Sequence, residues 1–96
     1  MRESEIEKYL VKKVKALGGE VRKVKWIGRN GAPDRAVMLP ARMCEPYWTQ
    51  RVVWVELKAT GKVPEPHQLR EHERMRAVSQ IVVVIDSIEG VDALLA

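Results

Sequence analysis

The segment that most constrains the fold is residues 51–58, which read Arg-Val-Val-Trp-Val-Glu-Leu-Lys. Its β-branched and aromatic residues predict a strand, and their nearly continuous run predicts a central strand that is covered on both faces. Glu56 and Lys58 interrupt this run, and because they are two positions apart their side chains project from the same face. Charges beneath a covering layer are costly unless something compensates them, so we expect this pair to serve a purpose beyond folding.

The other segments show helical and strand patterns with clear boundaries. Ser4 and Glu7 match a helix capping box, apolar residues then recur at helical spacing, and Gly18-Gly19 ends the helix. Pro66 suits the first turn of a second helix running to about Ser79, and Ser87 suits the cap of a short third helix. The remaining expected elements are an edge strand at 20–27, a turn at 28–31, a short strand at 35–39 closed by Pro40, a loop at 40–50, and a buried strand at 81–85.

These elements predict a single α/β domain over residues 1–96, in the order α-β-β-β-α-β-α. Short connections join the first three strands, which predicts an antiparallel meander. The strand, helix and strand between Val52 and Ile85 predict a right-handed parallel crossover. The expected fold is therefore a mixed β-sheet flanked by helices.

Composition narrows the range of functions. No apolar run approaches the roughly 20 residues that span a bilayer, and the charged N-terminus lacks the apolar stretch of a signal peptide. The single cysteine, Cys44, cannot form an intramolecular disulfide, so we expect a cytoplasmic protein with no membrane partner. The net charge is +4, and basic side chains dominate between Lys8 and Arg35. Nucleic acid as a partner explains this bias, and a solvated face is the alternative explanation.

A third polar residue stands just before the strand at 35–39. Pro33 restricts its own backbone and that of Ala32, which holds Asp34 rigidly at the start of the sheet. If the two strands are neighbours, Asp34 and Glu56 approach each other, and two nearby carboxylates repel unless a cation lies between them. Mg²⁺ is the natural candidate because it prefers hard oxygen ligands. The structural alternatives are a turn role for Asp34 and a simple ion pair between Glu56 and Lys58.

At this point the residues resemble a known family. Gly31-Ala32-Pro33-Asp34, followed 22 residues later by Glu56-Leu57-Lys58, resembles the core of PD-(D/E)XK nucleases. Glu7 on the first helix and Gln68 on the second make the chain similar to the VRR-NUC branch, the virus-type replication-repair nucleases. The resemblance covers nearly the whole chain and implies a restriction-endonuclease-like core, encoded by a phage or prophage. Arg35 departs from the pattern, since an apolar residue is expected after the aspartate.

The resemblance implies a role for each matching residue. Asp34 and Glu56, with the backbone carbonyl of Leu57, would hold Mg²⁺ or Mn²⁺, which lowers the pKa of a bound water and neutralises charge on the phosphate. Lys58 would orient the attacking water and stabilise negative charge. Glu7 would bind the metal through water or hold a second ion, and Gln68 would position water or a neighbouring ligand. For Glu7 a purely structural role in the helix cap is the alternative.

Several basic or polar residues are candidates for contact with nucleic acid. They are Lys8, Lys12 and Lys15, which form a stripe on the first helix, and Arg29, Asn30 and Arg35 around the start of the sheet. We expect His67 and His72 on the surface of the second helix. Tyr47 and Trp48 are expected to cover the sheet or to pack against a second subunit, and stacking on bases is the alternative.

The expected function is that of a Mg²⁺-dependent DNA endonuclease acting as a homodimer. Two symmetric cuts suit branched DNA such as a four-way (Holliday) junction. The alternative is a non-catalytic nucleic-acid-binding or assembly module with the same fold, and an RNA-directed nuclease remains a third possibility.

Overall fold

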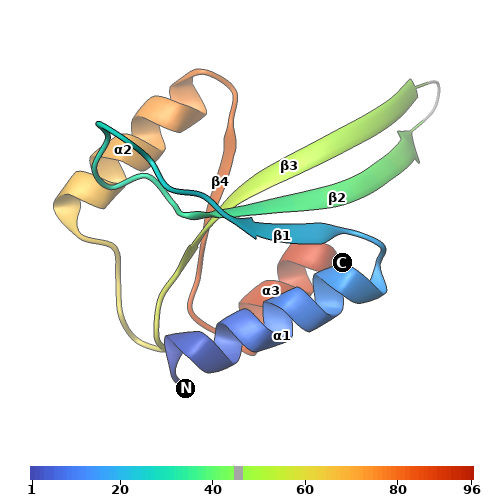
Figure 1. The fold of residues 1–96 in the computed structure, drawn as a ribbon, viewed down its shortest axis with the longest axis horizontal. Helices are drawn as coiled ribbons and strands as arrows, with labels where there is room; N and C mark the ends of the chain where they lie inside the picture. Colours follow the sequence, from blue (N-terminus) through green and yellow to red (C-terminus); the bar gives the residue numbers. More distant parts are fainter. Residues whose placement is uncertain (45–46) are drawn as a thin grey trace.

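The described residues form a four-stranded sheet and three helices, in the predicted order (Figure 1). The structure is a computed structural model, which describes the backbone of residues 1–44 and 47–96 and the side chains of residues 1–41 and 51–96. The elements are α1 (Glu3–Ala16), β1 (Glu20–Lys23), β2 (Arg35–Cys44), β3 (Tyr47–Leu57), α2 (Pro66–Ala77), β4 (Ile81–Ile85) and α3 (Ile88–Leu95).

The sheet has the topology that the connections predict. Its strand order is β1-β2-β3-β4, with β1, β2 and β3 antiparallel and β4 parallel to β3. The strand that carries Glu56 is therefore interior, with a hydrogen-bonded neighbour on each side. The predicted mixed sheet, its edge strand β1 and the interior position of β3 are confirmed. The prediction that β3 is covered on both faces holds only near Glu56, because Val52 is 45% exposed.

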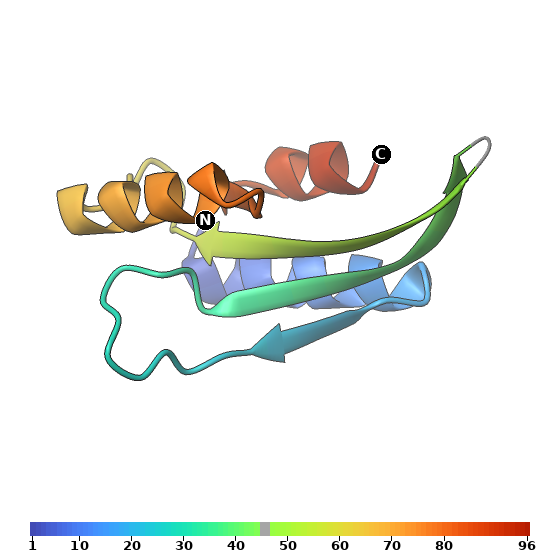
Figure 2. The ribbon, with the colours of Figure 1, turned by 90° about the horizontal axis from the view of Figure 1, so that it is seen from above.

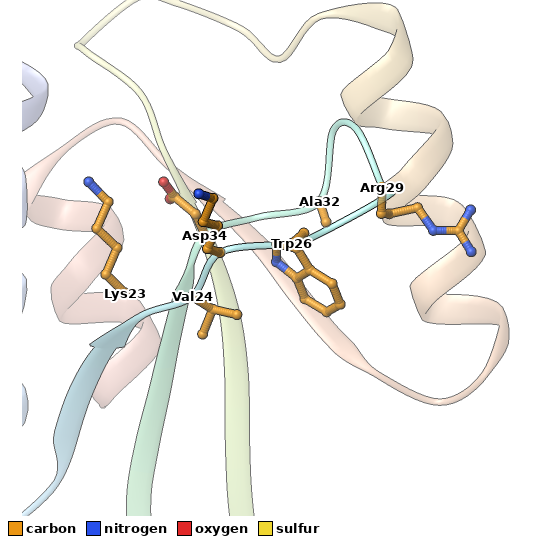
Figure 3. A pocket seen from close by; sticks show the side chains of 7 residues that line it. Lys23, Val24, Trp26, Arg29, Ala32 and Asp34 are labelled. Atoms are coloured by element: carbon orange, nitrogen blue, oxygen red, sulfur yellow. The ribbon is translucent and has the colours of Figure 1, made fainter.

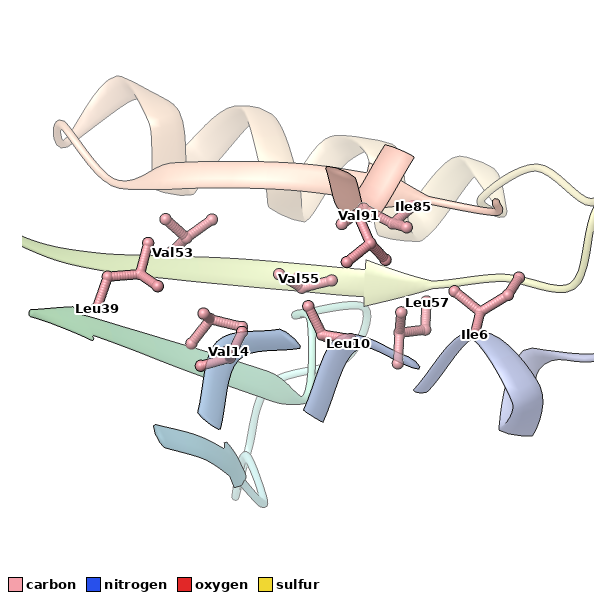
Figure 4. Packing of buried hydrophobic residues seen from close by; sticks show 10 residues of the cluster. Ile6, Leu10, Val14, Leu39, Val53, Val55, Leu57, Ile85 and Val91 are labelled. Carbon is pink, nitrogen blue, oxygen red and sulfur yellow. The ribbon is translucent and has the colours of Figure 1, made fainter. Parts of the chain in front are cut away.

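Helices α1 and α3 pack side by side against one face of the sheet and form the core with it (Figure 4). Alternate residues of β3 point into this core, which places the residues between them on the opposite face. Helix α2 covers one end of that opposite face (Figures 1 and 2). The core residues are Ile6, Leu10, Val14, Val37, Leu39, Val53, Val55, Leu57, Ile85 and Val91. No helix within the described part of the chain is both long and apolar enough to cross a membrane.

The start of α1 differs from the prediction. The N-cap is Arg2 rather than Ser4, and the backbone N–H of Arg2 donates to Glu5 Oε1 at 3.2 Å. The predicted capping box of Ser4 and Glu7 is therefore wrong. Because Glu5 takes the capping role, the carboxylate of Glu7 is free for a contact elsewhere.

The predicted loop at 40–50 is also wrong. Strand β2 continues to Cys44 and β3 begins at Tyr47, so the two form a long hairpin beyond the rest of the sheet (Figure 2). The register shifts between Leu39 and Arg42, which admits Pro40 into the strand because a bulge tolerates a residue without an N–H. The prediction about the side chains of Tyr47 and Trp48 lies outside the described residues.

Strand β1 ends at Lys23 rather than at residue 27, and residues 24–34 form a loop that reaches α2 (Figure 1). The backbone N–H of Val24 donates to the carbonyl of Asp34 at 2.9 Å, which closes the base of this loop. Gly31 has a φ of +85°, and a Cβ placed there would lie 2.7 Å from the carbonyl oxygen of His67. Only glycine allows the loop to pack this closely against the start of α2.

Replacing Gly31 with alanine should therefore destabilise the protein by about 2 kcal/mol or more, since backbone strain and a steric clash both act there. Gly28→Ala is the matched control, because Gly28 has a similar φ of +75° and a Cβ at that position would meet nothing within 4 Å. That control should cost only about 1 kcal/mol. Urea unfolding measures both values, and equal losses would contradict close packing of the loop against α2.

Candidate active site

The buried carboxylate of Glu56 is the centre of the site. Glu56 is the second-last residue of β3, is only 8% exposed, and faces α2. Its Oε1 lies 3.4 Å from Nε2 of His72, and its Oε2 lies 3.8 Å from Nζ of Lys58. The expectation that Glu56 and Lys58 share a face beneath a covering helix is met.

This environment does not fully compensate the charge of Glu56. Burial raises the pKa of Glu56 from its ordinary value to about 7. The positive charge of Lys58 acts in the opposite direction, and the negative charge of Asp34 raises the pKa further. Asp34 and Glu56 therefore interact electrostatically, and a cation placed between them would relieve the repulsion.

Gln68 holds the ammonium group of Lys58 in place. The Gln68 Oε1 atom accepts a hydrogen bond from Lys58 Nζ at 2.9 Å and another from the backbone N–H of Glu65 at 2.8 Å. The second contact is part of the capping of α2, with Pro66 at the first helical position. One amide side chain thus links the start of α2 to the lysine of the site.

Arg35 connects the two other predicted carboxylates. Its Nη1 lies 2.8 Å from Asp34 Oδ1, and its Nε donates to Glu7 Oε2 at 2.6 Å. Burial disfavours the Arg35 guanidinium, but hydrogen bonding and charge from Glu7 and Asp34 outweigh that effect and raise its pKa. Glu7 is therefore held by Arg35 beside the site. The Arg35 side chain is only 11% exposed, so its charge is directed to these carboxylates rather than to open solvent.

The donor set suits a hard divalent cation. Within the described residues, no group of three or more His, Cys, Asp or Glu side chains is gathered closely enough to hold a metal ion. Mg²⁺ does not require such a cage, because it commonly takes one or two carboxylates and retains several waters. Asp34, whose side chain is half exposed, and the carboxylate of Glu56, whose charge is only partly compensated, meet that requirement.

His72 is a residue of the site that sequence reasoning missed. Its side chain is fully buried, so the prediction of a surface position is wrong. Burial lowers the pKa of His72, and Arg76 lowers it further. A neutral imidazole that donates from Nε2 would hold Glu56 and leave the lone pair of Nδ1 buried without a partner. The available signal was its spacing of four residues from Gln68, which puts both on one face of α2.

The predicted nucleic-acid contacts occupy different environments. Arg29 lies 3.5 Å from the buried carboxylate of Glu71, and this ion pair connects the 24–34 loop to α2. Glu71 also pairs with Arg74 on the same helix. Asn30 at the tip of that loop is exposed, as are Lys8, Lys12 and Lys15 on α1. Contact of these residues with nucleic acid stays a prediction.

Known proteins resemble this chain over almost its whole length. A phage protein named "Putative nuclease p44", from Acyrthosiphon pisum secondary endosymbiont phage 1, is 44% identical over 87 residues, covering 91% of this chain and 85% of that protein. A solved structure described as a VRR_NUC domain is 41% identical, with a TM-score of 0.81, and the match covers 97% of this chain and 92% of that one. No protein-family profile matches the chain.

The raised pKa of Glu56 predicts a specific pH dependence of stability. The folded protein retains the Glu56 proton up to about pH 7, whereas an unfolded glutamate releases it near 4.5. The stability associated with this proton is thus present at low pH and is lost as the pH rises through 7. In EDTA, the free energy of unfolding of the wild type, relative to Glu56→Gln, should fall by on the order of 2 kcal/mol between pH 5 and pH 8.

The comparison with Glu56→Gln isolates the effect of Glu56. Titration of His72 changes stability with pH in the opposite direction, but His72 is present in both proteins, so its contribution cancels in the difference. Its lowered pKa means that stability from the neutral imidazole is lost as the pH falls below its ordinary range. Urea unfolding at pH 5, 6, 7 and 8 measures both proteins. If the free energies of unfolding of the two proteins changed in parallel with pH, ionisation of Glu56 would not destabilise the metal-free protein, and the prediction would be wrong.

Proposed function

Because this chain belongs to the VRR-NUC family, the virus-type replication-repair nucleases, we propose that it is a metal-dependent DNA endonuclease that hydrolyses phosphodiester bonds. One observation carries the proposal: Glu56 is buried, its charge is only partly offset by a lysine that Gln68 holds in place, and the charge of Asp34 raises its pKa further. Such an arrangement destabilises a protein that only binds nucleic acid and has no use for a buried carboxylate. It suits a protein that binds a cation at this carboxylate.

In the proposed mechanism, Asp34, Glu56 and the backbone carbonyl of Leu57 would hold Mg²⁺, with Mn²⁺ as a substitute. When bound, the ion supplies a water of lowered pKa and neutralises charge on the phosphate. Lys58 donates to the oxygen on which negative charge develops, and its bond to Gln68 keeps the ammonium aimed there. His72 fixes the orientation of the Glu56 carboxylate.

Arg35 gives Glu7 a defined role in this mechanism. Through Arg35, Glu7 is coupled to the carboxylate of Asp34, so it positions a metal ligand from the side of α1. We therefore propose that Glu7 acts indirectly, through Arg35 or through a metal-bound shell of water, rather than as a direct ligand.

We further propose that the protein works as a homodimer on branched DNA. Met38 and Val52 are register partners on β2 and β3, so their side chains project from the same face of the sheet. They are 44% and 45% exposed, although both belong to strands of the sheet. A second copy that covered this apolar face would bring two sites into one assembly, as paired cuts in a branched substrate require.

The catalytic proposal predicts that Lys58→Met lowers the cleavage rate by about 10²- to 10³-fold, because the charge that stabilises the transition state is lost. Asp34→Asn should lower the rate similarly and weaken Mn²⁺ binding. Lys62→Met, in an exposed loop, is the matched control and should retain activity. Rates are measured on linear, flapped and four-way DNA and on RNA, each with Mg²⁺, Mn²⁺ and EDTA.

The outcomes separate the candidate functions. Cleavage that EDTA abolishes and that favours four-way DNA would support the full proposal, whereas preferential cleavage of RNA would correct its substrate. Binding that depends on salt but not on chelator, without cleavage under any condition, would favour the non-catalytic module instead.

The dimer proposal predicts that Val52→Arg shifts the protein toward a monomer, because a charge would be buried at the interface. Ile27→Arg is the control, since Ile27 is 91% exposed in the 24–34 loop. Sedimentation velocity over a range of concentrations measures both. A wild type that stays monomeric throughout, or a dimer that Val52→Arg leaves unchanged, would contradict the proposal.

A further inference from the structure

A groove of about 590 Å³ opens beside Asp34, between the end of β1 and the 24–34 loop (Figure 3). Val24, Trp26 and Ala32 supply its apolar lining, and Asp34 is also part of its wall. Lys23, Lys25 and Arg29 supply its positive charges. The groove thus combines an aromatic ring and several cations next to a carboxylate of the proposed active site.

The indole of Trp26 is fixed in position. Its Nε1–H donates to the carbonyl of Pro33 at 2.8 Å, and its ring packs against Trp54 with centroids 5.1 Å apart and planes tilted by 54°. Trp54 is itself held by a hydrogen bond of 3.0 Å to Gln80. A preorganised aromatic ring loses little conformational freedom when a flat ligand stacks on it.

The cations of the groove differ in how they are used. Arg29 is directed to Glu71, at 3.5 Å, and points toward α2 (Figure 3). Lys23 and Lys25 are exposed, and among the described side chains neither lies within ion-pair distance of a carboxylate. Their two ammonium groups are therefore available to an external anion.

A polyanion that also presents flat aromatic faces matches these features. A base in a duplex is stacked between its neighbours and offers no free face, whereas an unpaired base can stack on a partly buried indole that lines an open groove, as Trp26 does. Phosphates of the same strand would then meet the two lysines. The favoured ligand is therefore a single-stranded segment of nucleic acid.

We propose that this groove binds an unpaired strand of the DNA substrate, with a base on Trp26 and flanking phosphates on Lys23 and Lys25. The inference rests on the proposed nuclease function, because Asp34 is a proposed metal ligand. A strand bound in the groove beside Asp34 would have its phosphates close to the active site. The preferred branched substrates are then DNAs that present unpaired bases next to the scissile bond, either in a flap or at a branch point where base pairs open.

Binding in EDTA tests the groove without cleavage, by fluorescence anisotropy of a labelled single strand of about 12 nucleotides, within the range of known single-strand site sizes, and of a labelled blunt duplex. Lys23→Gln combined with Lys25→Gln should weaken single-strand binding by about tenfold and reduce the salt slope by roughly 1.4, the value for two phosphates. Duplex affinity should change less than about threefold. Lys62→Gln with Arg70→Gln removes the same charge from exposed positions that do not line the groove and should leave the single-strand preference intact.

Substitutions at Trp26 separate stacking from charge. Trp26→Leu should weaken single-strand binding by at least about fivefold, while Trp26→Phe should restore most of it, because any aromatic face can stack on a base. Equal losses for single strand and duplex, or no loss in either lysine or tryptophan variants, would overturn the groove proposal. This binding test does not depend on cleavage. A protein that cleaves no substrate in the separate cleavage assay but still prefers single strands would therefore refute the nuclease function and leave the groove proposal standing.

Discussion

The arrangement of the site follows from one constraint, a carboxylate buried at the end of an interior strand. Glu56 projects from β3 beneath α2, where it is only 8% exposed and water solvates its charge poorly. The surrounding groups reduce the resulting cost without removing it: Lys58 contributes positive charge, and His72 contributes a polar contact. The pKa of about 7 reflects the remaining imbalance, which a divalent cation shared with Asp34 would relieve.

Around this carboxylate, contacts that stabilise the fold also orient the site. Gln68 caps α2 and holds Lys58, so the position of the helix and the aim of the ammonium group depend on one side chain. Arg35 links Asp34 to Glu7 on α1. Gly31 allows the 24–34 loop to contact α2 and places the groove next to Asp34. Elements on both faces of the sheet therefore meet at the same end of it.

Much of the fold and part of the site could be predicted because they depend on local pattern. The order of elements, the topology of the sheet, the boundaries of β4 and the cap at Ser87 all agree with the structure. The errors have local causes too. Pro40 suggested the end of a strand, but a register shift accommodates it. At the start of α1, Glu7 matches a capping box with Ser4 in the sequence, whereas in the structure Glu5 takes this role with Arg2.

By itself, the sequence determined that a Glu-x-Lys pair ends a buried strand and that Asp34 stands at the start of its neighbour, because strand periodicity and a proline act over a few residues. Only the tertiary structure decided the partners of these residues. Arg35 reaches Glu7 across 28 positions, His72 is buried against Glu56, and Trp26 packs on Trp54. Such contacts depend on how helices and loops pack against the sheet, which no local pattern encodes.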